Sequence, residues 1–312
     1  MKKLYAEDGA VFLSDTYKYH FPLEFFEPVG GYSVLIMRIG GRFLRLFSLE
    51  NAPLASTLFC AICLSILGAL IFEYLEWSIE SELMRFYVVL GFLFIPIANF
   101  SSVGSICNLY FYFMAASAVL IIAPIENVKH EKLRITVLII GALSLPVQVL
   151  LIPLLLIRIW LTKTTAKRII LQKADISWIF ALFLQFVFIL STAFGQRLPH
   201  EPQSILKVIY LYLDRAIGIS IIPGWGFVSG NAQNPQFDNT IYFHNLYFRF
   251  LLSFLSLLIF ILIIYRSLSA SKTNGFVSAS IIGESALFTG VIGLFFNPEP
   301  RYMVFGSFCI IW

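Results

Sequence analysis

The 312-residue chain is 59% hydrophobic and only 13% charged, with a mean hydropathy of +0.84. Soluble domains carry roughly 25% charged residues, so about half that proportion together with several long apolar runs predicts an all-α, polytopic transmembrane bundle. The formal net charge is +4, and no glycine-rich nucleotide-binding loop occurs. Nothing in the chain therefore points to ATP, nicotinamide or nucleic acid as a partner.

The stretch Ala6-Glu7-Asp8-Gly9 places two adjacent carboxylates ahead of a mostly apolar chain. Acidic groups are expensive to bring near lipid, so in membrane proteins they are usually paired or functional. The alternative is a solvated loop in which Asp8 caps a helix beginning at Gly9 and Glu7 lies near the positive end of that helix. Both interpretations remain open at this point.

Residues 9–48 are amphipathic rather than uniformly apolar, because aromatic and charged side chains are interspersed there. Three arginines, at spacings of four and three, fall on one helical face: Arg38, Arg42 and Arg45. Aromatic helices with a charged face lie along the membrane interface. We therefore predict an external loop over residues 1–50, with two interfacial helices joined by a turn at residues 28–32.

The rest of the chain, residues 51–312, is predicted to contain about eight membrane helices, and the whole chain is predicted to form one transmembrane domain. The apolar segments are residues 53–74, 83–99, 106–124, 135–160, 176–194, 241–265 and 276–296, followed by a last run that stops at Trp312. A helix that ends within lipid is unfinished, so we expect a fragment of a longer protein.

The run at residues 135–160 lies between two basic links. A single crossing would place one of these links outside, against the positive-inside rule. Two short helices that meet near Ser144, Leu145 and Pro146 place both links inside, and proline suits such a helix boundary. With this hairpin counted, the acidic loop, the link at residues 195–239 and the loop around Arg301 share the non-cytoplasmic face.

Five short motifs follow one another along the chain: Glu7-Asp8-Gly9, Gly31-Tyr32 with Arg38, Asn108-Leu109-Tyr110-Phe111-Tyr112, Leu143-Ser144-Leu145-Pro146, and Pro300-Arg301-Tyr302. In this order they resemble bacterial polytopic membrane proteins of the GT-C glycosyltransferase superfamily, in particular members with an acidic-pair-glycine loop. The similarity extends over nearly the whole chain. The chain departs from the family pattern in two ways: no span precedes the acidic loop, and Tyr110 and Phe111 stand where relatives often show His-Trp.

The resemblance implies a GT-C-like bundle with interfacial helices in the first external loop. It also implies a polyprenyl-phosphate sugar as donor and transfer of a hexose or pentose on the non-cytoplasmic side of the inner membrane. The acceptor would be a glycan, lipid or protein. Asp8 or Glu7 would act as general base or, in some members, as a ligand of a divalent metal such as Mg or Mn.

Four further residues are candidates for substrate binding beside Arg38. Arg301 suits a phosphate because its planar fork binds two oxygens at once, with Tyr302 as a hydrogen-bonding neighbour. The alternatives are a snorkelling arginine and an aromatic-belt tyrosine. His200 and Glu201 would contact the acceptor or be solvated surface. Arg38 would steer the anionic donor or meet lipid phosphates.

The main alternative function is a transporter or flippase of a lipid-linked or anionic substrate. That class predicts repeated halves and discontinuous helices with charged residues near the midplane. The sequence has no convincing internal repeat, and the acidic pair and Arg301 are predicted at one face, which favours the enzyme. A non-catalytic scaffold is a third hypothesis, left open by the Tyr110-Phe111 departure.

Overall fold

The structure is a computed structural model, which describes residues 8–29, 32–93, 105–124, 130–166 and 171–191 together with Leu258. The chain divides into two compact units, residues 1–89 with 100–198 and residues 90–99 with 199–312. Nearly all described residues belong to the first unit. The predicted spans at residues 241–265 and 276–296 lie outside the described residues.

Throughout the described ranges the regular structure is helical, apart from a single bridge between Val29 and Tyr32. The prediction of an all-α chain is therefore confirmed for this part. The helices and short helical turns are η1 (Asp8–Leu13), α1 (Ser14–Lys18), η2 (Leu23–Phe26), α2 (Leu35–Leu44), α3 (Ala52–Tyr74), α4 (Glu82–Leu93), η3 (Ile106–Asn108), α6 (Leu109–Ile122), α7 (Glu131–Ala142), η4 (Pro146–Leu151), α8 (Ile152–Ala166) and α9 (Lys173–Ser191).

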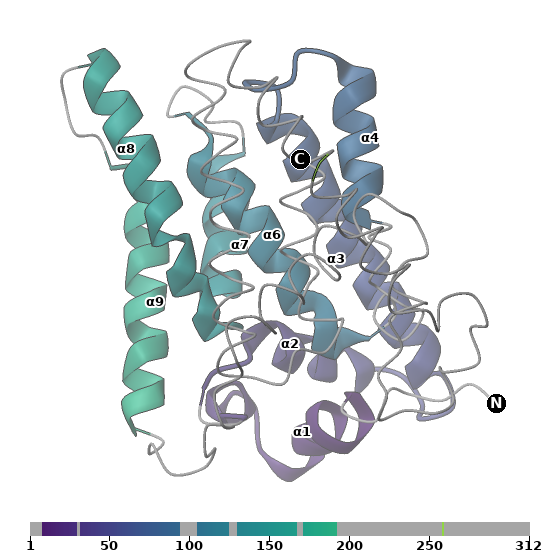
Figure 1. Cartoon of the computed structure of the whole chain (residues 1–312). Helices are drawn as coiled ribbons and strands as arrows, with labels where there is room; N and C mark the ends of the chain where they lie inside the picture. Colours follow the sequence, from purple (N-terminus) through teal and green to yellow (C-terminus); the bar gives the residue numbers. More distant parts are fainter. Residues whose placement is uncertain are drawn as a thin grey trace. The chain divides into compact units, whose positions relative to one another are not determined.

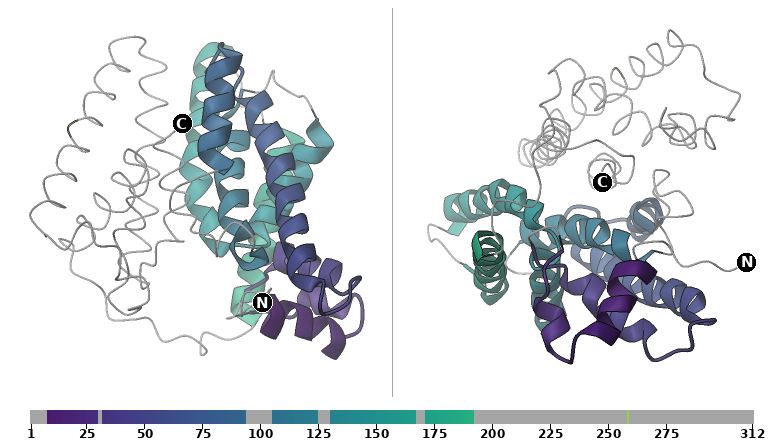
Figure 2. Two further views of the ribbon diagram at one scale, coloured as in Figure 1. Left: turned by 90° about the vertical axis from the view of Figure 1, so that its right-hand side faces the viewer. Right: turned by 90° about the horizontal axis from the view of Figure 1, so that it is seen from below.

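The amino-terminal segment is more broken than predicted. Val29 and Tyr32, which lie on either side of the centre of the predicted turn at residues 28–32, are joined by a hydrogen bond from the Val29 N–H to the Tyr32 carbonyl at 3.0 Å. The helix expected after the turn is α2, but before the turn the structure has three short pieces. Pro22, which has no N–H to donate, precedes η2 and separates it from α1. These pieces lie beside α2 at one end of the bundle (Figures 1 and 2).

Helix α6 is the most enclosed helix among those described. It contacts α3, α7 and α8, and all of its residues except Tyr110 are buried. It has no charged residue of its own. Its position in the middle of the bundle is visible in Figure 1, and both of its ends therefore depend on side chains from elsewhere for their hydrogen bonds.

The reversal predicted near Ser144, Leu145 and Pro146 is present. The tip of this hairpin contacts the start of α2: the N–H of Leu35 donates to the Leu143 carbonyl at 3.2 Å, and that of Ile36 donates to Ser144 Oγ at 2.9 Å. Helix α7 therefore leads to the α2 end of the bundle, and η4 with α8 leads away from it.

Two described helices, α3 and α9, are long and apolar enough to cross a membrane, and they match the predicted spans at residues 53–74 and 176–194. Residues 106–122 and 146–160 form shorter apolar helices. Helix α9 has an inverted pattern. Its buried positions are small or polar apart from Trp178, whereas its exposed positions include these large apolar side chains: Ile176, Ile179, Phe180, Phe183, Phe186, Val187 and Leu190.

Candidate functional site

Asp8 is the first residue of η1 and its side chain is fully buried. The carboxylate accepts hydrogen bonds from two backbone N–H groups at the start of η3: Ile106 to Oδ2 and Cys107 to Oδ1, both at 3.0 Å. Because η3 leads directly into α6, these N–H groups belong to those that a helix leaves without an internal partner. Asp8 is thus a helix cap, but of η3 and α6 rather than of a helix that begins at Gly9.

Two serine hydroxyls complete the surroundings of this carboxylate. Ser105 Oγ donates to Oδ1 at 3.2 Å, and Ser56 Oγ of α3 donates to Oδ2 at 3.3 Å. Each oxygen of Asp8 therefore accepts one N–H and one hydroxyl, which together fill the acceptor positions of a carboxylate. The N–H groups have fixed directions, whereas a hydroxyl hydrogen rotates to suit its partner.

Burial raises the pKa of the Asp8 carboxyl above its ordinary value of 3.8, and the hydrogen bonds from Ile106, Cys107, Ser105 and Ser56 act in the opposite direction. The positive end of the α6 dipole also favours the ionised carboxylate. A carboxyl whose pKa is raised above its ordinary value is a stronger base once ionised, and such groups serve as general bases.

The predicted divalent metal at Asp8 and Glu7 stays a prediction, because Glu7 lies outside the described residues. Mg²⁺ and Mn²⁺ require several oxygen ligands with free lone pairs, but the groups that face this carboxylate are hydrogen-bond donors. In the described ranges no three His, Cys, Asp or Glu side chains lie close enough to hold a metal ion.

Of the remaining predicted site residues, His200, Glu201, Arg301 and Tyr302 also lie outside the described residues. Their predicted roles stay predictions, as does a shared cavity with Asp8.

Arg38 is described, and it is 1% exposed. Its Nη1 donates to Asp15 Oδ2 at 2.5 Å and its Nη2 donates to the Glu27 carbonyl at 3.0 Å, while the guanidinium carbon lies 5.8 Å from the centre of the Phe12 ring. These contacts hold the amino-terminal segment on α2. A role of Arg38 in donor binding is not tested by them and stays a prediction.

The other two arginines of this face have the same kind of partner. Arg42 Nη1 lies 3.6 Å from Glu24 Oε1, and Arg45 donates to the Thr16 carbonyl. The predicted arginine face of α2 therefore contacts α1, η2 and the adjoining loop. The physical reason is that the broken segment folds back along α2 and brings its own acidic groups and carbonyls to the three cations.

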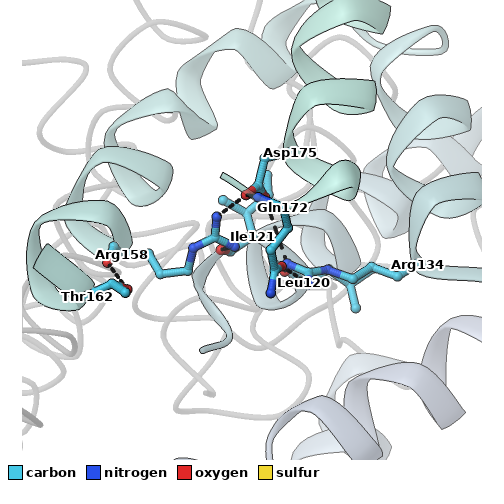
Figure 3. Close-up of polar contacts among 7 residues, drawn as sticks. All are labelled: Leu120, Ile121, Arg134, Arg158, Thr162, Gln172 and Asp175. Carbon is cyan, nitrogen blue, oxygen red and sulfur yellow. Dashed lines mark hydrogen bonds and ion pairs between the residues drawn. The ribbon is translucent and has the colours of Figure 1, made fainter. Parts of the chain in front are cut away.

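A second polar cluster lies at the carboxyl end of α6 (Figure 3), where the last carbonyls have no partner within the helix. Arg134 Nη2, from α7, donates to the Leu120 carbonyl at 2.5 Å, and Arg158 Nη1, from α8, donates to the Ile121 carbonyl at 2.8 Å. Two cations therefore lie at the negative end of the α6 dipole.

Asp175 of α9 connects these two arginines (Figure 3). Its Oδ2 accepts hydrogen bonds from Arg158 Nη2 and, at 2.9 Å, from the Gln172 N–H, while its Oδ1 lies 3.9 Å from Arg134 Nη2. The Gln172 side-chain oxygen accepts from Arg134 Nη1. The three charged side chains are 0–3% exposed, so this cluster joins α7, α8 and α9 at one end of α6.

Sequence reasoning did not single out the partners of Asp8 or the pair Arg158–Asp175. Arg158 lies inside an otherwise apolar run, and a charge in such a run is the available signal that it is paired. No comparable signal marks Ser56 or Ser105, because a small hydroxyl residue in an apolar helix or turn is common.

Comparison with protein-family models finds no matching family, and comparison with curated proteins and with solved structures finds no match. The described residues define an all-α chain with two helices able to cross a membrane, together with a buried carboxylate that caps a third helix.

Proposed function

We propose that the chain is a polytopic protein of the inner membrane with a GT-C-like helical bundle. The pattern of α9 supports this, since its buried positions include Asp175, Trp178 and Gln185 while its exposed face is aliphatic and aromatic. A large exposed apolar face is unfavourable in water but is the expected surface of a helix in lipid. The exposed side chains of α3, among them Leu54, Leu58 and Ile62, support the same proposal.

The proposed orientation places the acidic segment outside the cell and the basic ends of α7 and α8 inside. The basic residues in and beside the links that flank the hairpin support it. Arg134, Arg158, Lys163 and Lys173 all belong to the links and helix ends on the far side of the hairpin from α2, and positive residues favour the cytoplasmic side. Asp8 lies at the other end of α6.

We infer that the protein is a glycosyltransferase that moves a sugar from a polyprenyl-phosphate donor to an acceptor on the non-cytoplasmic face, with Asp8 as general base. The observation that carries this inference is the buried Asp8 carboxylate, whose pKa is raised by burial and whose position is fixed by two backbone N–H groups. A positioned carboxylate whose pKa is raised is a stronger base, which favours proton removal from a hydroxyl.

In the proposed step, Asp8 takes the proton of the acceptor hydroxyl while the acceptor oxygen forms a bond to the anomeric carbon. The bond between that carbon and the phosphate oxygen breaks, and polyprenyl phosphate leaves with the electron pair. The acceptor hydroxyl would take the place of a serine hydroxyl, because Ser56 and Ser105 can turn away whereas the N–H groups cannot. Arg301 and Tyr302 would hold the leaving phosphate.

The roles of the other predicted residues follow from this step. Glu7 would orient the acceptor beside Asp8, and His200 and Glu201 would contact the acceptor from the external link. Arg38 contributes through the segment that it holds in place, since both of its Nη atoms are bonded within that segment.

The test is transfer from a polyprenyl-phosphate sugar by wild type, Asp8→Asn and Glu7→Gln at equal levels in membranes. Since Asp8 also caps α6, the kcat of wild type is measured against pH. A base produces an acidic limb governed by the pKa of Asp8, whereas a purely structural cap produces none in folded protein. Asp15→Asn, which breaks a neighbouring ion pair, is the control and should keep the limb. Absence of transfer by wild type would favour the transporter.

Orientation is tested separately with single cysteines in a background without the native ones. Ser48 and Lys163 are both exposed, and the proposal places them on opposite faces of the membrane. An impermeant thiol reagent added to intact cells should label Ser48→Cys and leave Lys163→Cys unlabelled until the cells are opened. The reverse pattern would overturn the proposed orientation.

A further inference from the structure

The amino-terminal segment contains a second buried carboxylate, which the proposed mechanism does not use. Glu24 lies in η2 and is 0% exposed, yet neither of its carboxylate oxygens has a hydrogen-bond partner within the described residues. The nearest cation is Arg42, whose Nη1 lies 3.6 Å from Oε1 and likewise has no hydrogen-bond partner there. By contrast, Asp8 accepts four hydrogen bonds and Asp15 binds Arg38 at 2.5 Å.

An ionised carboxylate in this situation destabilises the fold. It has lost its hydration, and an ion pair without hydrogen bonds offsets only part of that loss. Buried polar groups of folded proteins nearly always have a partner, so an exception indicates a bound group or a functional role. Glu24 and Arg42 therefore have the features of two residues that bind one ligand.

The exposure of the neighbouring side chains shows from which side that component would come. The side chain of Arg42 is 36% exposed whereas that of Glu24 is 0% exposed, so the carboxylate is the inner member of the pair. The Phe21 ring lies 5.3 Å from the Arg42 guanidinium carbon and is 63% exposed. From outside inwards, the order is therefore an aromatic ring, a cation and a carboxylate.

The chemistry of the pair limits the ligand. A phosphate suits Arg42 but is repelled by Glu24, and an ammonium group has the opposite problem. A hydroxyl satisfies both, since it donates its hydrogen to the carboxylate and accepts a hydrogen bond from the guanidinium. The exposed face of Phe21 offers apolar surface for the C–H groups beside such a hydroxyl.

We propose that Glu24, Arg42 and Phe21 form a recognition site for a hydroxyl group of a sugar ring. The identification of the hydroxyl as part of a sugar rests on the proposed glycosyl transfer, and the ring belongs to either the donor or the acceptor. This role differs from that of Asp8, because Glu24 holds a hydroxyl and removes no proton.

The test is saturation-transfer NMR on the full chain in deuterated detergent micelles, with the methyl glycosides of a hexose and of a pentose as probes. Wild type should transfer saturation to at least one glycoside. Glu24→Gln and Arg42→Gln should weaken glycoside binding at least about tenfold, as expected for loss of a hydrogen bond to a charged group. The matched control is Glu27→Gln, which changes the same charge in the same segment; the described hydrogen bonds of Glu27 are made by its backbone N–H and carbonyl, which the substitution keeps.

A thermal unfolding measurement separates this role from a purely structural ion pair. Glu24→Gln keeps the shape and removes a buried carboxylate that Arg42 only partly compensates, while Arg42 is 36% exposed and can be hydrated, so the unfolding temperature of this variant should equal or exceed that of wild type. A lowered unfolding temperature with unchanged glycoside binding would overturn the proposal, as would absence of glycoside binding in wild type. Saturation transfer to glycerol phosphate but to neither glycoside would assign Glu24 and Arg42 to binding of a lipid headgroup and overturn the sugar assignment.

This test and the test of the proposed function can fail independently of each other. Glycoside binding that depends on Glu24, in a protein without transfer activity, would retain this site and end the glycosyltransferase hypothesis. Sugar transfer by Glu24→Gln with an unchanged KM would support the glycosyltransferase hypothesis and overturn the proposed hydroxyl site.

Discussion

The two ends of α6 are held by charges of opposite sign, and each sign opposes the partial charge of the helix end that it contacts. At the amino end a single carboxylate, Asp8, accepts from the N–H groups of Ile106 and Cys107. At the carboxyl end two guanidiniums, Arg134 and Arg158, donate to the last carbonyls. A helix without a charge of its own is thereby stabilised at both termini by its neighbours.

The ends differ in how completely their charged groups are satisfied. Each Asp8 oxygen has two donors, so that end is saturated with hydrogen bonds. At the other end two cations share Asp175, which leaves one excess positive charge, and the Nε atoms of both arginines have no partner in the described residues. The amino end thus depends on hydrogen-bond geometry, whereas the carboxyl end depends on one counter-ion.

This difference predicts the largest effect at Asp175. Replacement by asparagine keeps the shape but leaves two buried cations without a counter-ion, and breaking a buried ion pair in this way costs roughly 3–5 kcal/mol. We expect the free energy of unfolding to fall by about that amount. The measurement is unfolding by sodium dodecyl sulfate in mixed micelles, followed by tryptophan fluorescence.

The matched control is Glu80→Gln at an exposed position, which should change stability by less than about 0.5 kcal/mol. Adding Arg158→Met to Asp175→Asn should restore part of the loss, because it removes one of the two uncompensated cations. Additive losses in the double variant would contradict the shared counter-ion.

How much of this arrangement was predictable depends on the range of the interaction. The chain reversal near Ser144 was predicted correctly, because the basic links and the proline that indicated it are properties of the sequence itself. The importance of Asp8 was also visible, since an acidic residue stands out in an apolar chain. Its partner at Ile106 was not, because the two are 98 residues apart and every backbone N–H has the same chemistry in a sequence.

Residues at the carboxyl end show the same limit. Asp175 follows Lys173 at the start of a predicted span, where an acidic residue is ordinary for a helix beginning. Its contact with Arg158 depends on how two helices cross, which their separate patterns do not reveal. The amino-terminal segment was predicted as a longer helix because its amphipathic pattern outweighed the proline that separates η2 from α1.

The second largest effect is expected at the amino end of α6. In Asp8→Asn the amide nitrogen takes the place of one carboxylate oxygen, so it faces the N–H of either Ile106 or Cys107 instead of accepting from it. Loss of such a charged hydrogen bond, with a buried donor left unsatisfied, costs about 3 kcal/mol. The same unfolding measurement should show this loss, and Ser56→Ala should lose only about 1 kcal/mol because it removes one rotatable donor. Equal losses in the two variants would contradict the distinction between fixed and rotatable donors.

The third prediction concerns Gly41, which affects the amino end of α6 indirectly because η1 approaches α2 closely at this residue. A Cβ atom on Gly41 would lie 2.5 Å from the Phe12 carbonyl oxygen, which is backbone and cannot turn away. Gly41→Ala should therefore push η1 off α2, disturb Asp8 and cost about 2 kcal/mol through overpacking. The control is Gly141→Ala, whose nearest neighbour is the movable Gln148 amide at 2.4 Å. Because both changes gain the same helix propensity, Gly41→Ala should be the more destabilising; the opposite order would show that η1 adapts.

The smallest expected effect is a change in the free energy of unfolding with pH, which again distinguishes the two ends of α6. Burial raises the pKa of the Asp8 carboxyl above 3.8, so between its unfolded and folded pKa values the folded state binds more protons than the unfolded state. Stability from this group is therefore greatest below the unfolded pKa and falls as pH rises through the folded pKa. The difference in unfolding free energy between wild type and Asp8→Asn, measured from pH 4 upwards, should decline with pH, because the other titrating groups cancel. A difference that grows with pH would mean that the N–H donors of Ile106 and Cys107 outweigh burial, which would leave Asp8 a permanently ionised cap without the raised pKa that suits a base.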